Sequence, residues 1–139
     1  MTYEEERKYP DVKVPMEDDD IPHYHGHTVR QIFFACGIIM LLGLTFFYDE
    51  IRVGTFLPLF GVLFIGLIAG FTNPRQKISI FLDVVISLLS LAFFELSAVY
   101  RYQAYGINDG YFVFAQMLSI LFFVALYYSA KTLRGMTVR

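Results

Sequence analysis

From Lys77 to Arg101 the chain reads KISIFLDVVISLLSLAFFELSAVYR, and this stretch decides the fold. Its apolar run is long enough to cross a bilayer, since about 20 residues of helix suffice. A cation closes each end, and two carboxylates, Asp83 and Glu95, interrupt the run. Lipid penalises such groups, so the segment is expected to pack against partners that satisfy them.

The rest of the chain repeats this apolar character in separate blocks. Hydrophobic residues make up 56% of the 139 residues, against about 45–50% in ordinary soluble domains. The mean hydropathy is +0.51. The pattern predicts an all-α integral membrane protein whose four transmembrane helices form an up-down-up-down antiparallel bundle, because the connecting loops are short. The expected spans are 32–48, 53–71, 78–100 and 111–130.

Residues 1–27 differ in composition from the predicted transmembrane domain, residues 28–139. This N-terminal tail is polar, acidic and His-containing, with three prolines, so it is expected to be disordered. Thr28 and Gln31 match a capping box directly before the first apolar block. The sequence therefore predicts that the first helix begins at about Thr28.

The distribution of basic residues predicts an orientation. Only Arg52 and Arg101 fall on one side of the predicted bundle, and every other Lys and Arg falls on the other side. The positive-inside rule then predicts that both termini lie on the cytoplasmic side of the membrane, which would be a plasma membrane or an inner membrane. The outer rim is expected to carry an aromatic belt of tyrosines: Tyr48, Tyr100, Tyr102, Tyr105 and Tyr111.

The two carboxylates of the third span lie at intermediate depth. Each is six positions from Leu89, about 9 Å along the helix axis, and so about 6 Å inside the hydrocarbon edge. If the last two helices pair with Tyr100 level with Tyr111, Glu95 faces the level of Gln116. Asp83 then faces the level of Tyr128, with Tyr127 beside it. Both matches supply hydrogen-bond donors.

Serines extend the polar character of the third span. Ser87, Ser90 and Ser97 lie on one broad helical face with Asp83, which predicts a polar stripe that points into the bundle. Charged side chains offer further partners, namely Arg30, Lys77 or Lys131 for Asp83 and Arg52 or Arg101 for Glu95. The leading interpretation is that these groups stabilise helix packing.

An ion or proton site is the alternative interpretation of the same residues. Intramembrane carboxylates bind cations and carry protons in transport proteins. Asp83 and Glu95 differ by about 120° of rotation, so they do not share one helical face. A transporter built on them would have to be an oligomer, because one four-helix bundle has little room for a wet path.

Small residues mark the second span and the first. Gly61, Gly66 and Gly70 lie along the second span, and Gly66 with Gly70 forms a GxxxG pattern that favours close helix contact within the chain or between copies. Cys36 lies about one turn inside the first span and is expected to be a packed small residue.

Three histidines, His23, His25 and His27, alternate at the end of the tail. An extended chain would put their imidazoles on one side, where they form a weak candidate site for zinc, nickel or copper. The spacing is not a recognised zinc signature, so neither a metal nor another cofactor is expected.

The chain carries no enzyme motif such as GxSxG, HExxH, CxxC or a P-loop. The formal charge of −2 provides no basic field for nucleic acid. The sequence therefore predicts a non-catalytic multi-pass membrane protein that lies in the lipid bilayer and forms a homo-oligomer or an accessory subunit of a larger membrane complex. The alternative is a small oligomeric ion channel or proton-coupled transporter that uses Asp83 and Glu95.

Overall fold

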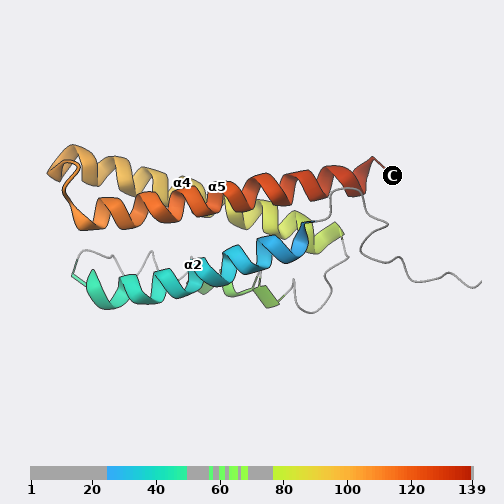
Figure 1. The fold of residues 1–139 in the computed structure, drawn as a ribbon, viewed down its shortest axis with the longest axis horizontal. Coiled ribbons are helices and arrows are strands. Elements are labelled where there is room, and N and C mark those ends of the chain that lie inside the picture. Colours follow the sequence, from blue (N-terminus) through green and yellow to red (C-terminus); the bar gives the residue numbers. More distant parts are fainter. Residues whose placement is uncertain are drawn as a thin grey trace, which may run out of the picture.

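Three helices in the computed structural model are long and apolar enough to cross a membrane (Figure 1). The structure describes residues 25–49, 57, 60–61, 63–65, 67–68 and 77–138. Helix α2 spans Gly26–Phe46, α4 spans Lys77–Tyr105 and α5 spans Gly110–Thr137. Within these ranges the chain is helical apart from its turns and ends, which confirms the all-α class, and three of the predicted segments form helices long and apolar enough to span a membrane.

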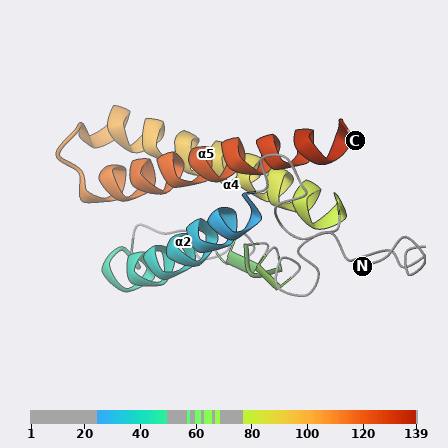
Figure 2. The ribbon, with the colours of Figure 1, turned by 45° about the vertical axis from the view of Figure 1, so that its right-hand side comes forward.

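The three helices run side by side, with α5 packed against both α4 and α2 (Figures 1 and 2). Helices α2 and α4 begin at the end of the bundle where α5 finishes, so each is antiparallel to α5 (Figures 1 and 2). We call the end that carries the turn between α4 and α5, residues 106–109, the loop end. The predicted second span, 53–71, lies largely outside the described residues.

Helix α5 has a continuous buried seam whose positions are spaced alternately four and three residues apart. An average spacing of about 3.5 residues is the repeat that lets helices pack along their whole length at a shallow angle. Helix α2 repeats the pattern on the side that faces α5. The buried positions of the two seams are Tyr111, Ala115, Leu118, Phe122, Ala125, Ser129, Thr132 and Met136 on α5, and Gly26, Val29, Phe33, Cys36, Met40 and Gly43 on α2.

An aromatic layer joins the three helices in the middle of the core. The rings of Phe94 on α4 and Phe122 on α5 stack at 5.8 Å with an interplanar angle of 6°. Phe33 on α2 meets Phe122 at 6.2 Å. All three side chains are fully buried. We call Phe33, Phe94 and Phe122 the aromatic layer.

The observed helix ends differ from the predicted ones at two places. Helix α2 begins at Gly26 with His25 as its N-cap residue, so the predicted start at Thr28 is wrong. Gly26 and Val29 are already buried in the seam, and their packing extends the helix. Helix α5 continues to Thr137 instead of ending near Ala130, because Thr132 and Met136 carry its seam onward and Met136 packs with Ile80 of α4.

The turn at the loop end has residues that suit its backbone. Gly106 has a φ of 81°, in the left-handed region that glycine adopts without strain. Asp109 is the N-cap residue of α5, and its carboxylate accepts a hydrogen bond from the Phe112 amide at 3.0 Å. This turn makes α4 and α5 a tight antiparallel hairpin.

The described positions between 57 and 68 are helical and lie beside α2 (Figure 1). Leu63 is 2% exposed and belongs to the core, with Phe60 and Leu67 half-buried against it. These three residues recur at helical spacing, so one face of this segment is packed on the bundle.

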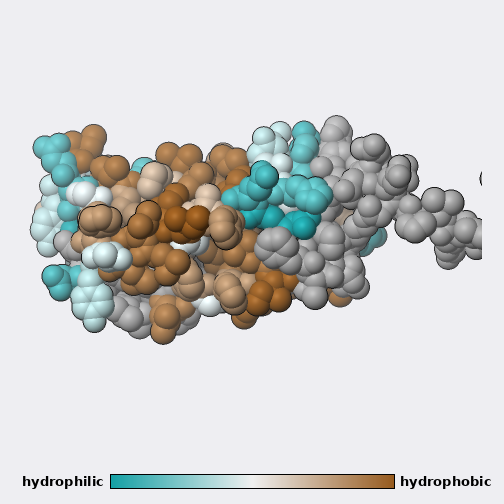
Figure 3. All heavy atoms as spheres, turned by 60° about the horizontal axis from the view of Figure 1, so that its bottom comes forward, coloured by the Kyte–Doolittle hydropathy of each residue, from teal (hydrophilic) through white to brown (hydrophobic). Residues whose placement is uncertain are grey.

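The surface has the distribution expected of a protein in a bilayer. On the face shown in Figure 3, apolar residues form a band between more hydrophilic ends. Among the tyrosines of the predicted belt, Tyr48, Tyr100, Tyr102 and Tyr105 are exposed, whereas Tyr111 is 7% exposed. Tyr111 departs from the prediction because its ring packs against Phe47 and Phe114 in the core.

Candidate functional site

The N-terminal half of α4, away from the loop end, carries a buried polar stripe. Ser79, Asp83, Ser87 and Ser90 are all buried, and each follows the previous one by three or four residues. Side chains at this spacing share one helical face. The stripe ends one turn later at Phe94, where the aromatic layer begins.

Asp83 lies inside the bundle and is 3% exposed. Arg30 of α2 is close enough for its charge to act on the Asp83 carboxylate, so one of the charged partners offered by the sequence is present. The predicted tyrosines do not hydrogen-bond to Asp83. The Tyr128 ring instead packs 5.1 Å from His25, and Tyr127 is 57% exposed. Equal depth along α4 and α5 places Tyr128 at the level of Asp83. The direction of the Tyr128 ring depends in addition on its contact with His25, at the start of α2.

The hydroxyl groups of Ser87 and Ser90 distinguish this stripe from the other polar groups of the helices. Both are fully buried and make no hydrogen bond. Ser97 and Ser129, in contrast, donate to the carbonyl oxygens of Phe93 and Ala125 one turn earlier. Two buried hydroxyls beside an acid provide the polar groups that a bound water or ion would use.

Glu95 lies on the other side of α4, and its side chain is exposed at the surface between α4 and α5. Gln116 Nε2 donates to Glu95 Oε2 at 3.4 Å, the partner that depth matching predicts. Ser119 Oγ donates to the same oxygen at 2.6 Å. Ser119 was not among the predicted partners of Glu95, although Ser119 lies three residues after Gln116 and therefore on the same face of α5. Asp83 and Glu95 are therefore not brought together.

His25 and His27 do not have the extended geometry on which the predicted histidine cluster depends. His23 lies outside the described residues. Because α2 begins at Gly26, His25 is the N-cap residue of a helix and His27 lies in its first turn, so the two do not form part of an extended strand. The His25 amide donates to Thr132 Oγ1 at 3.0 Å, which joins the start of α2 to α5. In the described part of the chain, no three His, Cys, Asp or Glu side chains gather as metal ligands would.

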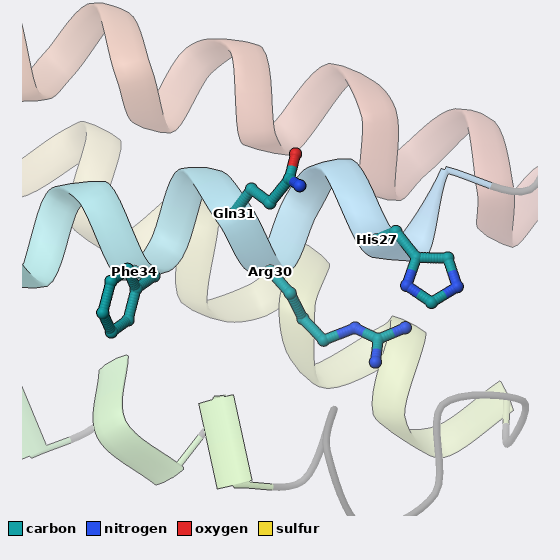
Figure 4. Close-up of a pocket in the computed structure, with 4 residues that line it drawn as sticks. All are labelled: His27, Arg30, Gln31 and Phe34. Carbon is teal, nitrogen blue, oxygen red and sulfur yellow. The ribbon is translucent and has the colours of Figure 1, made fainter.

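His27 instead lines an open hollow of about 340 Å³ on α2, together with Arg30, Gln31 and Phe34. Figure 4 shows His27, Arg30 and Phe34 on one side of the helix, whereas Gln31 points to the other side. The hollow combines a guanidinium, an imidazole and an aromatic ring.

The small residues singled out in the sequence have different surroundings. Gly61 is exposed, and a Cβ added there would meet no other side chain within 4 Å. Gly66 and Gly70 lie outside the described residues. Cys36 is fully buried in the α2 seam. The close helix contact that the structure describes falls instead at Gly43, which lies directly against the ring of Phe114.

Arg101 does not pair with Glu95, because Asp109 engages it at the loop end. Arg101 Nε and Nη2 donate to the two carboxylate oxygens of Asp109, each at 2.9 Å. The guanidinium also lies 4.4 Å from the ring centre of Tyr105 and 5.2 Å from that of Tyr111. The forked geometry of arginine suits this bidentate contact, which fixes the turn between α4 and α5. Arg52 lies outside the described residues.

The hydrogen bonds from Arg101 hold the pKa of Asp109 below its ordinary value of 3.8; partial burial opposes this effect, and the Phe112 amide reinforces it. Its contribution to stability is therefore complete above about pH 4 and is lost as the pH falls through the lower pKa of the folded protein. We expect Asp109→Ala to lower the free energy of unfolding at pH 7 by about 1–2 kcal/mol, since the helix cap and the ion pair are both removed.

Asp109→Asn separates these two contributions, because asparagine retains the cap but not the charge. Thermal unfolding in detergent at pH 7 and pH 3 measures the effect. Wild type is expected to lose more stability than Asp109→Asn between the two pH values. An equal loss in both proteins would show that the Arg101–Asp109 pair does not contribute.

The chain was also compared with known families and proteins. No known family model, curated protein or solved structure matches it.

Proposed function

We propose that this chain is a non-catalytic membrane protein that associates laterally, with another copy or as an accessory subunit of a larger membrane complex. The observation that carries the proposal is the outward position of Glu95. Its carboxylate is exposed within the apolar length of α4, where lipid is a poor solvent for charge. Contact with a neighbouring membrane protein would cover this acid.

The interior of the described helices supports the same proposal. The buried polar stripe on α4 reaches Ser90 and is followed by the aromatic layer, whose three rings are fully buried. A path for ions between the depth of Asp83 and the depth of Glu95 would have to pass these rings. Because Asp83 points into the bundle and Glu95 points out, the two acids do not line a common path.

Transport is the second candidate function, and the buried stripe is the observation that favours it. Asp83, Ser87 and Ser90 combine an acid with two hydroxyls that make no hydrogen bond. Such a set would accept a proton or a small cation from the end opposite the loop end. A transporter of this kind would need a second route past the aromatic layer, formed in an oligomer.

The distribution of charge supports an orientation for the proposed protein. Lys77, Lys131 and Arg134 lie at the end opposite the loop end, whereas Arg101 lies at the loop end. Under the positive-inside rule both termini would be cytoplasmic and the loop end would face outward, in a plasma or inner membrane.

Purified protein in liposomes distinguishes the two candidates. We expect no proton, Na⁺ or K⁺ flux above that of protein-free liposomes, with a channel-forming peptide as the positive control. Asp83→Asn and Glu95→Gln should change thermal stability or the protein mass measured in mild detergent. Flux in wild type that either substitution abolishes, while the variant remains helical and monodisperse, would replace the association proposal with transport.

A further inference from the structure

The described residues satisfy only one of the two oxygens of the Glu95 carboxylate. The hydrogen bonds from Ser119 and Gln116 both end on Oε2. Within the described ranges, no donor reaches Oε1 and no cation forms an ion pair with the carboxylate. Oε1 therefore receives no hydrogen bond from the described residues, at a depth where a bilayer would leave few water molecules to reach it.

Gln116, which donates a hydrogen bond to Glu95, also lines an apolar hollow on α5. On α4, Leu88 and Val99 are exposed and share the helical face of Glu95. On α5, a hollow of about 350 Å³ lies beside Gln116. It is almost wholly apolar, and Phe112, Val113, Gln116, Met117, Ile120 and Leu121 line it. We call Glu95, Gln116 and this hollow the Glu95 surface.

The charges of the described chain indicate which partner this surface suits. Arg101, the nearest basic residue on α4, is held by Asp109 at the turn. The basic residues Lys77, Lys131 and Arg134 belong to the opposite end of the bundle. A two-fold contact between two copies through this surface would bring two Glu95 carboxylates together, and like charges repel strongly in a medium of low dielectric.

We propose that the Glu95 surface binds a transmembrane helix of a different membrane protein that carries a lysine or arginine at the depth of Glu95. The basic side chain would donate to Oε1, and the apolar side chains next to it would fill the hollow beside Gln116. This inference rests on the proposed function, since it names the chemistry of the partner. Satisfied polar contacts of this kind strengthen helix association in bilayers.

A synthetic helix provides a direct test with the full-length protein. The probe is a leucine-based transmembrane peptide with one lysine six residues from its centre, which matches the position of Glu95 relative to Leu89. Matched control peptides carry leucine or glutamate at that position. Association in phosphatidylcholine liposomes is measured by energy transfer between labelled peptide and labelled protein.

We expect the lysine peptide to associate roughly 3- to 30-fold more tightly than the leucine peptide with wild type. Glu95→Gln should remove most of this preference, although the amide oxygen still accepts from Ser119 and so supports the fold. Glu95→Lys should reverse the preference toward the glutamate peptide. Asp83→Asn, at a buried position outside the surface, should leave the lysine preference unchanged.

Equal binding of the three peptides by wild type would overturn the inference, as would a lysine preference that Glu95→Gln retains. Neither result would refute the proposed function, which depends on the absence of flux and on association in detergent. Conversely, flux abolished by Asp83→Asn would overturn the proposed function even if the lysine peptide bound as expected.

Discussion

Replacement of Phe122 with alanine is expected to lower the free energy of unfolding by about 2–3 kcal/mol. Phe122 is the one ring of the aromatic layer that contacts both of the others, Phe94 on α4 and Phe33 on α2. Its removal leaves a cavity where three helices meet. The loss comes from packing and not from transfer out of water, because lipid chains are as apolar as the core.

Phe123→Ala is the matched control for this experiment. Phe123 is the next residue on α5, but it is 60% exposed on the outside of the bundle. Its truncation should change stability by less than about 0.5 kcal/mol. Unfolding of the protein by SDS in mixed micelles, followed by circular dichroism, measures both variants. Similar losses for Phe122→Ala and Phe123→Ala would show that the aromatic layer does not hold α2, α4 and α5 together.

Gly43→Ala is expected to destabilise the contact between α2 and α5 by about 1–3 kcal/mol. A methyl group at Gly43 would overlap the ring of Phe114 on α5. The ring has little space to move, since Phe47 and Tyr111 pack on it at 5.4 Å and 5.9 Å. Relief of the overlap would therefore separate the two helices near the loop end.

Gly37→Ala provides the control within the same helix. A Cβ at Gly37 would meet Leu63 Cδ2 at 3.9 Å, an ordinary van der Waals contact. Because alanine favours helix more than glycine does, this variant should be neutral or slightly more stable. The two variants are compared by SDS unfolding at equal detergent concentration. A Gly43→Ala protein as stable as Gly37→Ala would contradict the close approach of α2 and α5.

The sequence predicted a partner of Glu95 but did not single out the partner of Asp83. The depth of Glu95 relative to Gln116 follows from the loop length and the helical rise, and the structure has the contact. The partner of Asp83 does not follow in the same way. Its depth suggests Tyr128, yet that ring lies on His25, and Arg30 of α2 is the residue whose charge acts on Asp83. Contacts between helices that are not adjacent in sequence depend on how each helix is rotated about its own axis. The positions of the apolar segments in the sequence do not specify this rotation.

The sequence alone determined that the protein is helical with segments long and apolar enough to span a membrane, that α4 and α5 form a hairpin, and that two acids lie within an apolar helix. Those properties depend on hydrophobicity, length and turn residues, which are local. The tertiary structure decided that Asp83 faces the interior while Glu95 faces outward, that Gly43 lies against the ring of Phe114, and that Arg101 pairs with Asp109. The physical reason is that these helices carry apolar side chains on every side, so hydrophobicity alone does not distinguish a face that meets lipid from a face that meets the core. The packing of small residues and aromatic rings then determines which face is buried.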